Sequence, residues 1–441
     1  MDSTPRQANG AAAPSRARFW VIVFAVTLAI IQYVDRVCIS QAKSYISADL
    51  HLTDSQMGWV FSAFTLAYAL FEIPAGYLGD RIGPRKVLLR IVLWWSFFTV
   101  ATGWAFNWVS LMATRFLFGA GEAGAFPNLT KAFNRWLPFE ERTRAQGIMW
   151  TSARLGGAFT PALVALILTF VNWRTAFLWF GLLGVVWGLI FFWWYRDDPR
   201  SHPAVNPAEA ALLPVQEPGT GAEQFAIPWR LMLTSRTVWC LCGQYFACSY
   251  SFYFFITWFP TYLLKARGFD LKQSALMAGA PLFVGAFGSL TAGWLMPILA
   301  RRTGSTGLVR RWVGAIGAAG AAIALLVAAS CQNPYWAVVA IAMGGFCNDL
   351  QMPGAWTACM DVGGKSVATL AGTMNMMGNV GGFLSPIVCG YLVEGTGNWN
   401  MALYVMAGVY VTGIFFWLGM DPVTPLELQN RTAQEKARAG A

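Results

Sequence analysis

The chain has 441 residues, of which 56% are hydrophobic and only 12% are charged, against about 25% charged in a soluble domain. This composition excludes a soluble globular protein and predicts a membrane protein. The formal net charge of +10 does not indicate nucleic-acid binding, because most of the 31 Lys and Arg residues fall in alternate loops between apolar runs.

Apolar runs of about 20 residues recur along the chain, and each could cross roughly 30 Å of hydrocarbon as a helix. They predict an all-α polytopic membrane protein with about 12 transmembrane helices. In chain order the expected spans are residues 19–40, 55–79, 86–106, 108–131, 143–170, 174–195, 236–264, 273–299, 310–331, 335–361, 366–393 and 400–420.

The loops that would share a side with both termini carry most of the basic residues, among them Arg16, Arg18, Arg142 and Arg144. By the positive-inside rule we expect both termini in the cytoplasm. The first apolar run is too long for the core of a signal peptide, so a retained first helix is expected. The eight cysteines form no CxxC pair, and we expect packing residues and no metal site.

One polar segment, 197–235, is rich in Pro, Gly, Glu and Ala and separates six apolar runs from the next six. We therefore expect two pseudo-symmetric six-helix bundles joined by a cytoplasmic linker. The expected parts are an N-terminal tail (1–18), an N-terminal bundle (19–196), the linker (197–235), a C-terminal bundle (236–420) and a C-terminal tail (421–441).

The two halves contain an internal repeat. The segment "GIMWTSARLGGAFTP" (147–161) aligns with "GTMNMMGNVGGFLSP" (372–386), with three glycines and the final proline at matching positions. An even number of spans separates the copies, so both run in the same direction through the membrane. Parallel six-helix repeats around a central cavity are a transporter architecture.

A short loop between the second and third runs reads "GYLGDRIGPRKVL" (76–88), and "GWLMPILARR" (293–302) is a weak echo of it in the second half. The positive-inside rule explains its Arg and Lys residues but neither its acid nor its glycine spacing. The loop resembles the major facilitator superfamily signature G-x-L-x-D-R-x-G-R-[RK]. The resemblance implies a functional monomer and a cytoplasmic latch, in which the Asp meets a helix N-terminus and the Arg residues pair across the two halves. The latch residues would be Gly76, Asp80, Arg81, Gly83, Arg85 and Lys86.

Charged residues within the expected spans are few, and each costs about 2.5–3.5 kcal/mol at mid-membrane, so they are functional by default and usually paired. Asp35 and Arg115 lie at nearly the same depth, Glu122 lies two turns deeper, and Arg154 reaches the midplane from the other side. We expect one polar column that lines a cavity. The alternative is a structural ion pair between Asp35 and Arg115, with Arg36 reaching the outer surface.

Glu122 stands out within this set, and two further acids, Glu72 and Asp349, extend it. Glu122 is too deep to reach water at the surface, and burial favours the protonated form of such a carboxyl, which makes it a candidate proton carrier. Glu72 is expected to belong to the latch. Asp349 either faces the cavity or packs away from it.

The segments "YVDR" (33–36), "RFLFGAGEAGAFPN" (115–128), "WFPTYL" (258–263) and "NMMGNVGGFLSP" (375–386) are similar to the anion:cation symporter family. The resemblance implies that Asp35 and Glu122 couple to protons, that Arg36 holds a substrate carboxylate and that Arg115 is a gating ion-pair residue. It also implies three polar positions lining the cavity, Tyr33, Tyr68 and Asn375.

Arg154 departs from the galactonate-type pattern, in which a neutral polar residue is more usual. A second cation indicates a dianionic or otherwise more acidic substrate, which would make Arg154 a substrate-binding residue; alternatively it neutralises Glu122. The "GAGEAG" segment (119–124) matches GxGxxG but follows no strand, so a dinucleotide site is excluded.

The expected function is therefore a proton-coupled symporter in a bacterial cytoplasmic membrane, importing a small organic anion such as a hexuronate, aldonate or aldarate. Its partners would be this anion, protons and the lipid bilayer, with the proton gradient in place of a cofactor. An exchanger of organic anions or phosphate esters without net proton movement is the alternative, and a membrane sensor that does not transport is a third. The sequence places no group of His, Cys or Ser residues near the end of a span, so an enzyme is not expected.

Overall fold

The computed structural model describes residues 13–214 and 228–439. Residues 1–12 of the expected N-terminal tail, 215–227 of the expected linker and 440–441 of the expected C-terminal tail lie outside this range. The described chain forms helices and no strands, which confirms the all-α prediction.

The first half begins at α1 and ends at α7. Polar caps at Thr53 and Asn107 begin two of its helices, each accepting a hydrogen bond from the backbone N–H three residues on, so an otherwise unpaired donor is satisfied. Its helices are α1 (Arg18–Leu50), α2 (Asp54–Ile82), α3 (Pro84–Gly103), α4 (Trp108–Glu122), α5 (Ala125–Trp136), α6 (Phe139–Phe170) and α7 (Trp173–Trp194).

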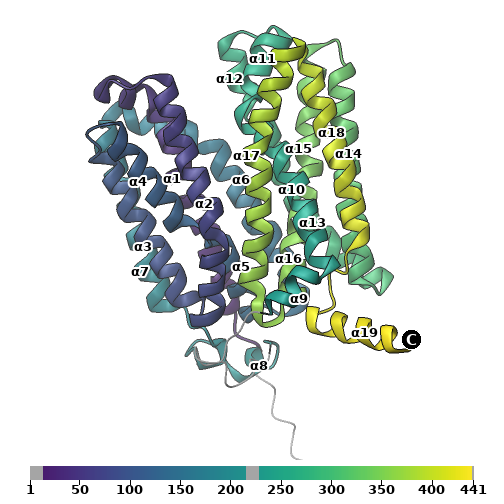
Figure 1. Ribbon diagram of the computed structural model, residues 1–441. Coiled ribbons are helices and arrows are strands. Elements are labelled where there is room, and N and C mark those ends of the chain that lie inside the picture. Colours follow the sequence, from purple (N-terminus) through teal and green to yellow (C-terminus); the bar gives the residue numbers. More distant parts are fainter. Residues whose placement is uncertain (1–12, 215–227, 440–441) are drawn as a thin grey trace, which may run out of the picture.

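Short helices follow in the connecting segment, namely η1 (Pro199–Ser201), α8 (Pro207–Ala210) and α9 (Trp229–Thr234). The second half then comprises α10 (Arg236–Thr257), α11 (Phe259–Arg267), α12 (Leu271–Ala278), α13 (Ala280–Thr303), α14 (Thr306–Ser330), α15 (Pro334–Leu350), α16 (Met352–Val362), η2 (Gly364–Ser366), α17 (Val367–Thr396) and α18 (Trp399–Gly419). A last helix, α19 (Leu426–Ala439), lies across the end of the bundle (Figure 1).

Within the described residues, nine helices are long and apolar enough to cross a membrane. The expected spans at 108–131, 236–264 and 335–361 are instead divided, into α4 and α5, α10 and α11, and α15 and α16. The expected span at 273–299 is also interrupted, near Gly279, between α12 and α13. Interrupted helices at membrane depth are tolerated where the freed backbone is buried in protein, and α5 and α16 are almost entirely buried.

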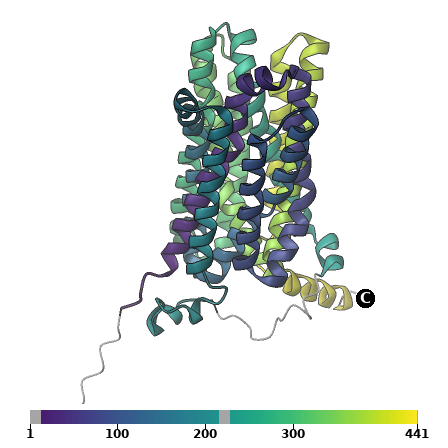
Figure 2. The ribbon, with the colours of Figure 1, turned by 90° about the vertical axis from the view of Figure 1, so that its left-hand side faces the viewer.

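The two halves lie side by side and approach each other at the end that carries α8, here called the linker end (Figures 1 and 2). Helix α2 packs on α17, and α6 packs on α13. A Cβ on Gly147 of α6 would lie 2.8 Å from the Cα of Gly293, and one on Gly372 of α17 would lie 2.8 Å from the carbonyl oxygen of Glu72. The aligned glycines of the sequence repeat therefore serve equivalent close contacts between the halves.

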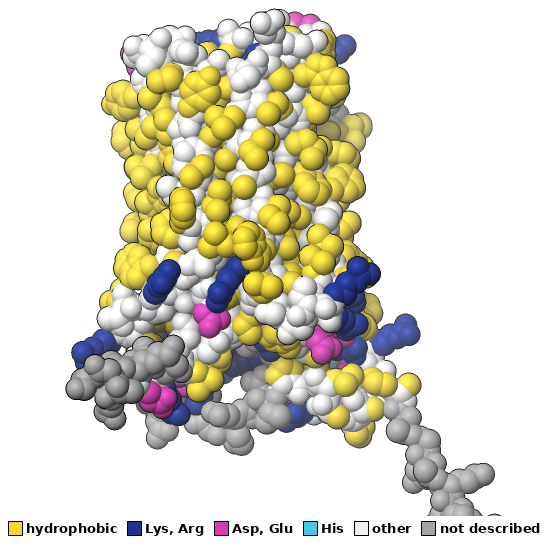
Figure 3. All heavy atoms as spheres, turned by 90° about the vertical axis from the view of Figure 1, so that its right-hand side faces the viewer, with side chains coloured by type: hydrophobic (Ala, Val, Ile, Leu, Met, Phe, Trp, Pro, Cys, Tyr) yellow, Lys and Arg dark blue, Asp and Glu magenta, His cyan; other side chains and the backbone are white. Residues whose placement is uncertain are grey.

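The outer surface is apolar over most of its height. Figure 3 shows a hydrophobic band, with Lys and Arg side chains gathered toward the linker end. Large apolar side chains such as Phe97, Phe170 and Trp193 are more than half exposed. An exposed apolar surface of this extent would be a liability in water, so it faces lipid.

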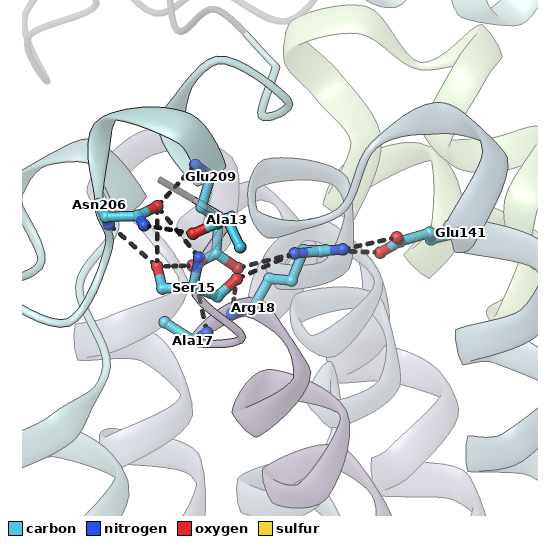
Figure 4. A network of polar contacts seen from close by, with 7 residues as sticks. All are labelled: Ala13, Ser15, Ala17, Arg18, Glu141, Asn206 and Glu209. Atoms are coloured by element: carbon cyan, nitrogen blue, oxygen red, sulfur yellow. Dashed lines mark hydrogen bonds and ion pairs between the residues drawn. The ribbon is translucent and has the colours of Figure 1, made fainter. Parts of the chain in front are cut away.

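Hydrogen bonds and ion pairs hold the start of α1 against the connecting segment at the linker end (Figure 4). Glu209 of α8 is fully buried and accepts hydrogen bonds from the backbone N–H groups of Ala17 and Arg18 and from the Ser15 hydroxyl. The Arg18 guanidinium bridges Glu209 at 3.0 Å and Glu141 at 2.9 Å. An acid at a helix N-terminus is stabilised by the free N–H groups and the helix dipole.

Candidate functional site

A cavity between the halves encloses about 430 Å³ of space, including open solvent at its mouth. Its lining comes from α1, α2, α5, α6, α10, α16 and α17. All five residues predicted to bind substrate belong to this lining, which consists of Tyr33, Arg36, Tyr68, Phe126, Trp150, Arg154, Tyr245, Ser249, Phe252, Tyr253, Met352, Asn375 and Asn379. The two charged side chains among these residues are both arginines.

Arg36 of α1 is paired with Glu122 of α4. Its Nε lies 2.5 Å from Oε1 of Glu122, whose side chain is fully buried, whereas the Arg36 side chain is 21% exposed. The guanidinium also lies 4.5 Å from the ring centroid of Tyr68. Within the described chain the Nη2 of Arg36 has no hydrogen-bond partner. Arg36 therefore lines the cavity and keeps one buried donor without a partner, while its counter-ion Glu122 does not belong to the lining.

Glu122 is the last residue of α4, where the fourth expected span is interrupted. Gly124 adopts a left-handed conformation (φ 83°), and a Cβ there would collide with the Cβ of Ala75 in α2. The side-chain amide of Asn128 donates to the carbonyls of Ala75 and Gly124, at 3.2 and 2.8 Å. Only glycine fits this turn without strain, so "GAGEAG" encodes the break beside Glu122.

Arg154 of α6 is paired with Asp349 of α15, across the two halves. Nε and Nη2 of Arg154 donate to the two carboxylate oxygens of Asp349 at 2.7 and 2.8 Å, a bidentate geometry. Nη1 of Arg154 donates to the Tyr33 hydroxyl at 3.0 Å. The sequence did not decide whether Asp349 faces the cavity. In the structure Asp349 lies directly behind the cavity wall. Arg154 does not pair with Glu122, which was one of the two alternatives.

Asn375 of α17 connects the halves below Tyr68. Its amide nitrogen donates to Oε1 of Glu72 at 2.7 Å and lies 3.4 Å from the Tyr68 hydroxyl. Glu72 was expected to belong to the latch, and this expectation is corrected by its contacts. Ten residues of α2 follow Glu72, which is enough helix to place this carboxyl away from the loop and at the depth of the cavity residue Asn375.

Asp35 and Arg115 are almost fully buried, at 1% and 2% exposure, and neither lines the cavity. Among the described residues the carboxylate oxygens of Asp35 and the Nε and Nη1 of Arg115 have no hydrogen-bond partner, and no ion pair joins the two. The Arg115 guanidinium packs on the ring of Phe118 at 4.1 Å. Asp35, Arg36, Arg115 and Glu122 nevertheless lie close enough to interact electrostatically, whereas Arg154, the fifth charge of the expected column, pairs with Asp349 across the halves.

The loop motif of residues 76–88 lies at the linker end. Asp80 accepts hydrogen bonds from the backbone N–H groups of Ala368 and Thr369, at 3.1 and 2.7 Å, and from the Thr369 hydroxyl at 2.6 Å. These donors belong to the first turn of α17, where free N–H groups favour a carboxylate. Lys131 of α5 forms an ion pair with Asp80 and donates to the carbonyl of Lys365 at 3.2 Å. Asp80 thus joins the two halves, with Lys131 as a partner that the sequence did not reveal.

One basic residue of this motif, Arg85, behaves differently from the expectation. Arg85 was expected to pair across the halves, but it donates to the carbonyl of Phe192 in α7, at 3.0 and 2.7 Å, within its own half. Gly83 has φ 89°, and a Cβ there would lie 2.5 Å from a carboxylate oxygen of Asp197. Arg81 and Lys86 are exposed. Gly76 allows contact with α17, because a Cβ there would collide with the carbonyl of Ala368.

A second ion-pair cluster closes the linker end. Asp361 of α16 binds Arg142 of α6 at 2.7 Å and Arg310 of α14 at 2.6 Å, all three largely buried. The Arg310 Nη1 also donates to the Pro422 carbonyl at 2.8 Å. Asp361 therefore binds one arginine from each half.

Several cavity residues were not found by sequence reasoning. Tyr245, Ser249, Phe252 and Tyr253 of α10 all face the cavity, and Asn379 lies one turn beyond Asn375 in α17. The Tyr253 hydroxyl donates to Asn379 at 3.2 Å. The four-residue spacing of polar and aromatic residues in 245–253 was the available signal, since such residues on one helix face can line a cavity.

Comparisons with known proteins agree with this architecture. The sequence model of the Major Facilitator Superfamily matches residues 25–386 and, in a second match, 307–440. The probable sulfoacetate transporter SauU of Cupriavidus necator is 36% identical over 93% of this chain and 95% of its own length. The probable galactarate/D-glucarate transporter GudP of Escherichia coli is 31% identical over 97% of this chain and 99% of its own length. The hexuronate transporter of Bacillus subtilis is 29% identical, covering 90% and 93%.

Solved structures show the same fold at low sequence identity. The proton:xylose symporter XylE superposes with a TM-score of 0.73 over 94% of this chain and 98% of that chain, at 13% identity. The fucose:proton symporter FucP of E. coli superposes with a TM-score of 0.67 over 91% and 98%, at 15% identity. The chain therefore belongs to the Major Facilitator Superfamily, as a multi-pass membrane transporter that resembles carriers of sugar acids and is not an enzyme.

Proposed function

We propose that this protein is a proton-coupled symporter that imports a small organic acid, with sugar acids such as hexuronates, aldonates and aldarates as the leading class. The observation that carries the proposal is the Arg36–Glu122 pair, in which the cation faces the cavity and the acid lies behind it. The named relatives carry sugar acids or sulfoacetate, and all of these substrates are small organic anions.

The pair supplies a reason for proton coupling. While Glu122 is ionised, it neutralises Arg36 and competes with an incoming carboxylate for the same guanidinium. When Glu122 takes up a proton, Arg36 loses its counter-ion and gains affinity for the substrate. A proton can drive transport only through such a difference in substrate affinity between states.

Asp35 is proposed as the second proton-coupling group and Arg115 as its gating partner. Both are buried beside the Arg36–Glu122 pair, and neither is satisfied by a hydrogen bond in the described structure. A buried unpaired charge costs free energy, so a change of partner or of protonation at Asp35 would strongly change the free energy of the conformation. Tyr33, Tyr68 and Asn375 offer hydrogen-bond groups for substrate hydroxyls.

The orientation follows from charge. Lys and Arg gather at the linker end (Figure 3), so this end is proposed to face the cytoplasm of a bacterial cell. The chain is proposed to work as a monomer, since the cavity is built between its own two halves.

Uptake by purified protein in liposomes tests the proposal. The panel comprises hexuronates, galactonate, glucarate and sulfoacetate, each with an imposed inward proton gradient and with none. We expect the gradient to drive accumulation of at least one acid, and Glu122→Gln to abolish this dependence. Accumulation that requires only a preloaded counter-anion would make the protein an exchanger.

A further inference from the structure

We propose that the cavity is adapted to an organic anion with two acidic groups, one bound by Arg36 and the other by Arg154. This inference rests on the proposed function, because it names the substrate class of the same cavity. Arg36 comes from α1 and Arg154 from α6, and both line the cavity while Glu122 and Asp349 do not. The cavity lining therefore includes two cations, and neither of their counter-ions belongs to it.

Arg154 keeps hydrogen-bond capacity despite its ion pair. A guanidinium carries five N–H donors. Asp349 takes one from Nε and one from Nη2, and the Tyr33 hydroxyl takes one from Nη1. One N–H on Nη1 and one on Nη2 remain for a ligand, which matches the two oxygens of a carboxylate or sulfonate.

The Arg154 guanidinium is also held in one position. The Phe252 ring centroid lies 4.0 Å from its central carbon, and the bidentate contact to Asp349 fixes its plane. Asp349 is itself fixed by the Asn348 amide at 3.2 Å, and Asn348 accepts from the Tyr410 hydroxyl at 2.7 Å. Binding to a preorganised donor costs less entropy than binding to a mobile arginine.

Tyr33 connects the two cations. Its hydroxyl accepts from Arg154, and its ring centroid lies 6.0 Å from the central carbon of Arg36. Among the described residues this hydroxyl acts only as an acceptor, so its own proton can be donated to a ligand between the arginines. A substrate with one acidic group would occupy Arg36 and leave the donors of Arg154 and Tyr33 without an anionic partner.

Matched acids test this assignment by equilibrium binding to the purified transporter. Galactarate and galactonate differ in whether the second end is a carboxylate or a hydroxymethyl group, and sulfoacetate and acetate differ in the sulfonate. One additional charge-assisted pair should favour the diacid of at least one of these matched pairs by about tenfold or more. If neither diacid binds more tightly than its matched monoacid, the assignment is wrong.

Variants then separate recognition from structure. The double variant Arg154→Gln/Asp349→Asn leaves no orphan buried charge, and we expect its diacid preference to fall to within about twofold of unity. Arg174→Gln is the matched control, because Arg174 pairs with Asp49 away from the cavity, and it should retain the wild-type preference. If Arg154 only bridges the halves, the double variant will bind both acids of a pair less tightly by the same factor, which would overturn the assignment.

Uptake measurements on the same samples keep this inference separate from the proposed function. Gradient-driven accumulation of a monoacid, with no preference for its diacid partner, would leave the symporter intact and remove the second anion site. Tenfold tighter diacid binding without any gradient-driven accumulation would support the second site and contradict proton symport.

Discussion

At Gly157 the lack of a side chain gives Tyr33 its position. A Cβ on Gly157 would lie 2.9 Å from Cδ1 and 3.1 Å from Cε1 of the Tyr33 ring, closer than such atoms normally approach. Gly157 lies one turn after Arg154 in α6, so the same helix face positions both the cation and the aromatic hydroxyl that it contacts.

We therefore expect Gly157→Ala to displace the Tyr33 ring and to raise the apparent KM for the transported acid about fivefold or more, since overpacking costs roughly 1–3 kcal/mol. Initial uptake rates across a substrate concentration series measure it. Gly156→Ala is the matched control, because its nearest atoms lie at 3.4–3.7 Å, an ordinary contact distance. An unchanged KM in Gly157→Ala would show that the Tyr33 position does not matter for binding.

The same residues show what the sequence could and could not reveal about the site. Arg36, Arg154 and Glu122 were found because a charge inside an apolar run is rare and easily recognised. Their partners were not assigned, since helix periodicity gives depth but not the position of one helix around another. The Arg154–Asp349 contact joins residues of different halves, and only the packed structure relates their helices.

At the scale of the elements, the contact between α2 and the start of α17, the predicted latch, depends on a single carboxylate. Asp80 accepts three hydrogen bonds from Ala368 and Thr369 and pairs with Lys131. The amide of Asn would lose the charge and part of the acceptor capacity. Hydrogen bonds to charged groups contribute about 1.5–3 kcal/mol, so Asp80→Asn should weaken closure of the linker end by an amount of this order.

Spin-label distances between Lys86 of α3 and Arg302 of α13, both exposed, measure that closure. In wild type we expect one short distance distribution, and in Asp80→Asn a second, longer one. Asp198→Asn is the control, because Asp198 caps η1 at the same end without crossing the halves. Identical distributions in Asp80→Asn and wild type would contradict a latch.

The docking of α8 on the start of α1 predicts a pH dependence. Burial alone would raise the pKa of Glu209, but the hydrogen bonds from Ser15, Arg18 and Ala17 outweigh it and lower that pKa below its usual value. A group with a lowered folded pKa stabilises the fold above its unfolded pKa, about 4.3 for Glu, and this contribution disappears as pH falls through the folded value. Acid should therefore weaken this contact, and neutral pH should not.

We expect Glu209→Gln to lower the melting temperature of the purified protein at pH 7, and the difference from wild type to shrink as the pH falls below about 4. Thermal unfolding at a series of pH values measures both. The exposed Glu394, at the opposite end, provides the control Glu394→Gln, which should follow wild type throughout. A difference that grows on acidification would refute the sign of this prediction.

The elements themselves were largely predictable, and their interruptions were not. Long apolar runs give α3, α7 and α18 close to the expected bounds, because a membrane span needs about 20 apolar residues, whereas α1 continues to Leu50, beyond the expected end at residue 40. The breaks after Glu122 and after Leu350 fall inside equally apolar runs. They depend on tertiary contacts, such as the approach of Gly124 to Ala75, which no periodicity reveals.

On the scale of the whole molecule, the two halves meet through paired contacts that repeat the internal symmetry. The glycines Gly147 and Gly372 permit close packing, Asp80 and Asp361 close the linker end, and Arg154 with Asp349 connects the cavity walls. The conformation is thus closed at the linker end. In the proposed alternating-access cycle these contacts would break as the halves rock about the cavity, so substrate and protons would have to alter the energies of the same few ion pairs.

Substrate-driven proton movement tests the central claim most directly. Liposomes containing the purified transporter, with equal pH on both sides and a pH-sensitive dye inside, are given the acid that the uptake panel identifies. The account predicts that wild type acidifies the interior as the acid enters, and that Glu122→Gln still exchanges labelled for unlabelled acid but moves no protons. Uptake of the acid without internal acidification by wild type, or equal acidification by Glu122→Gln, would contradict it.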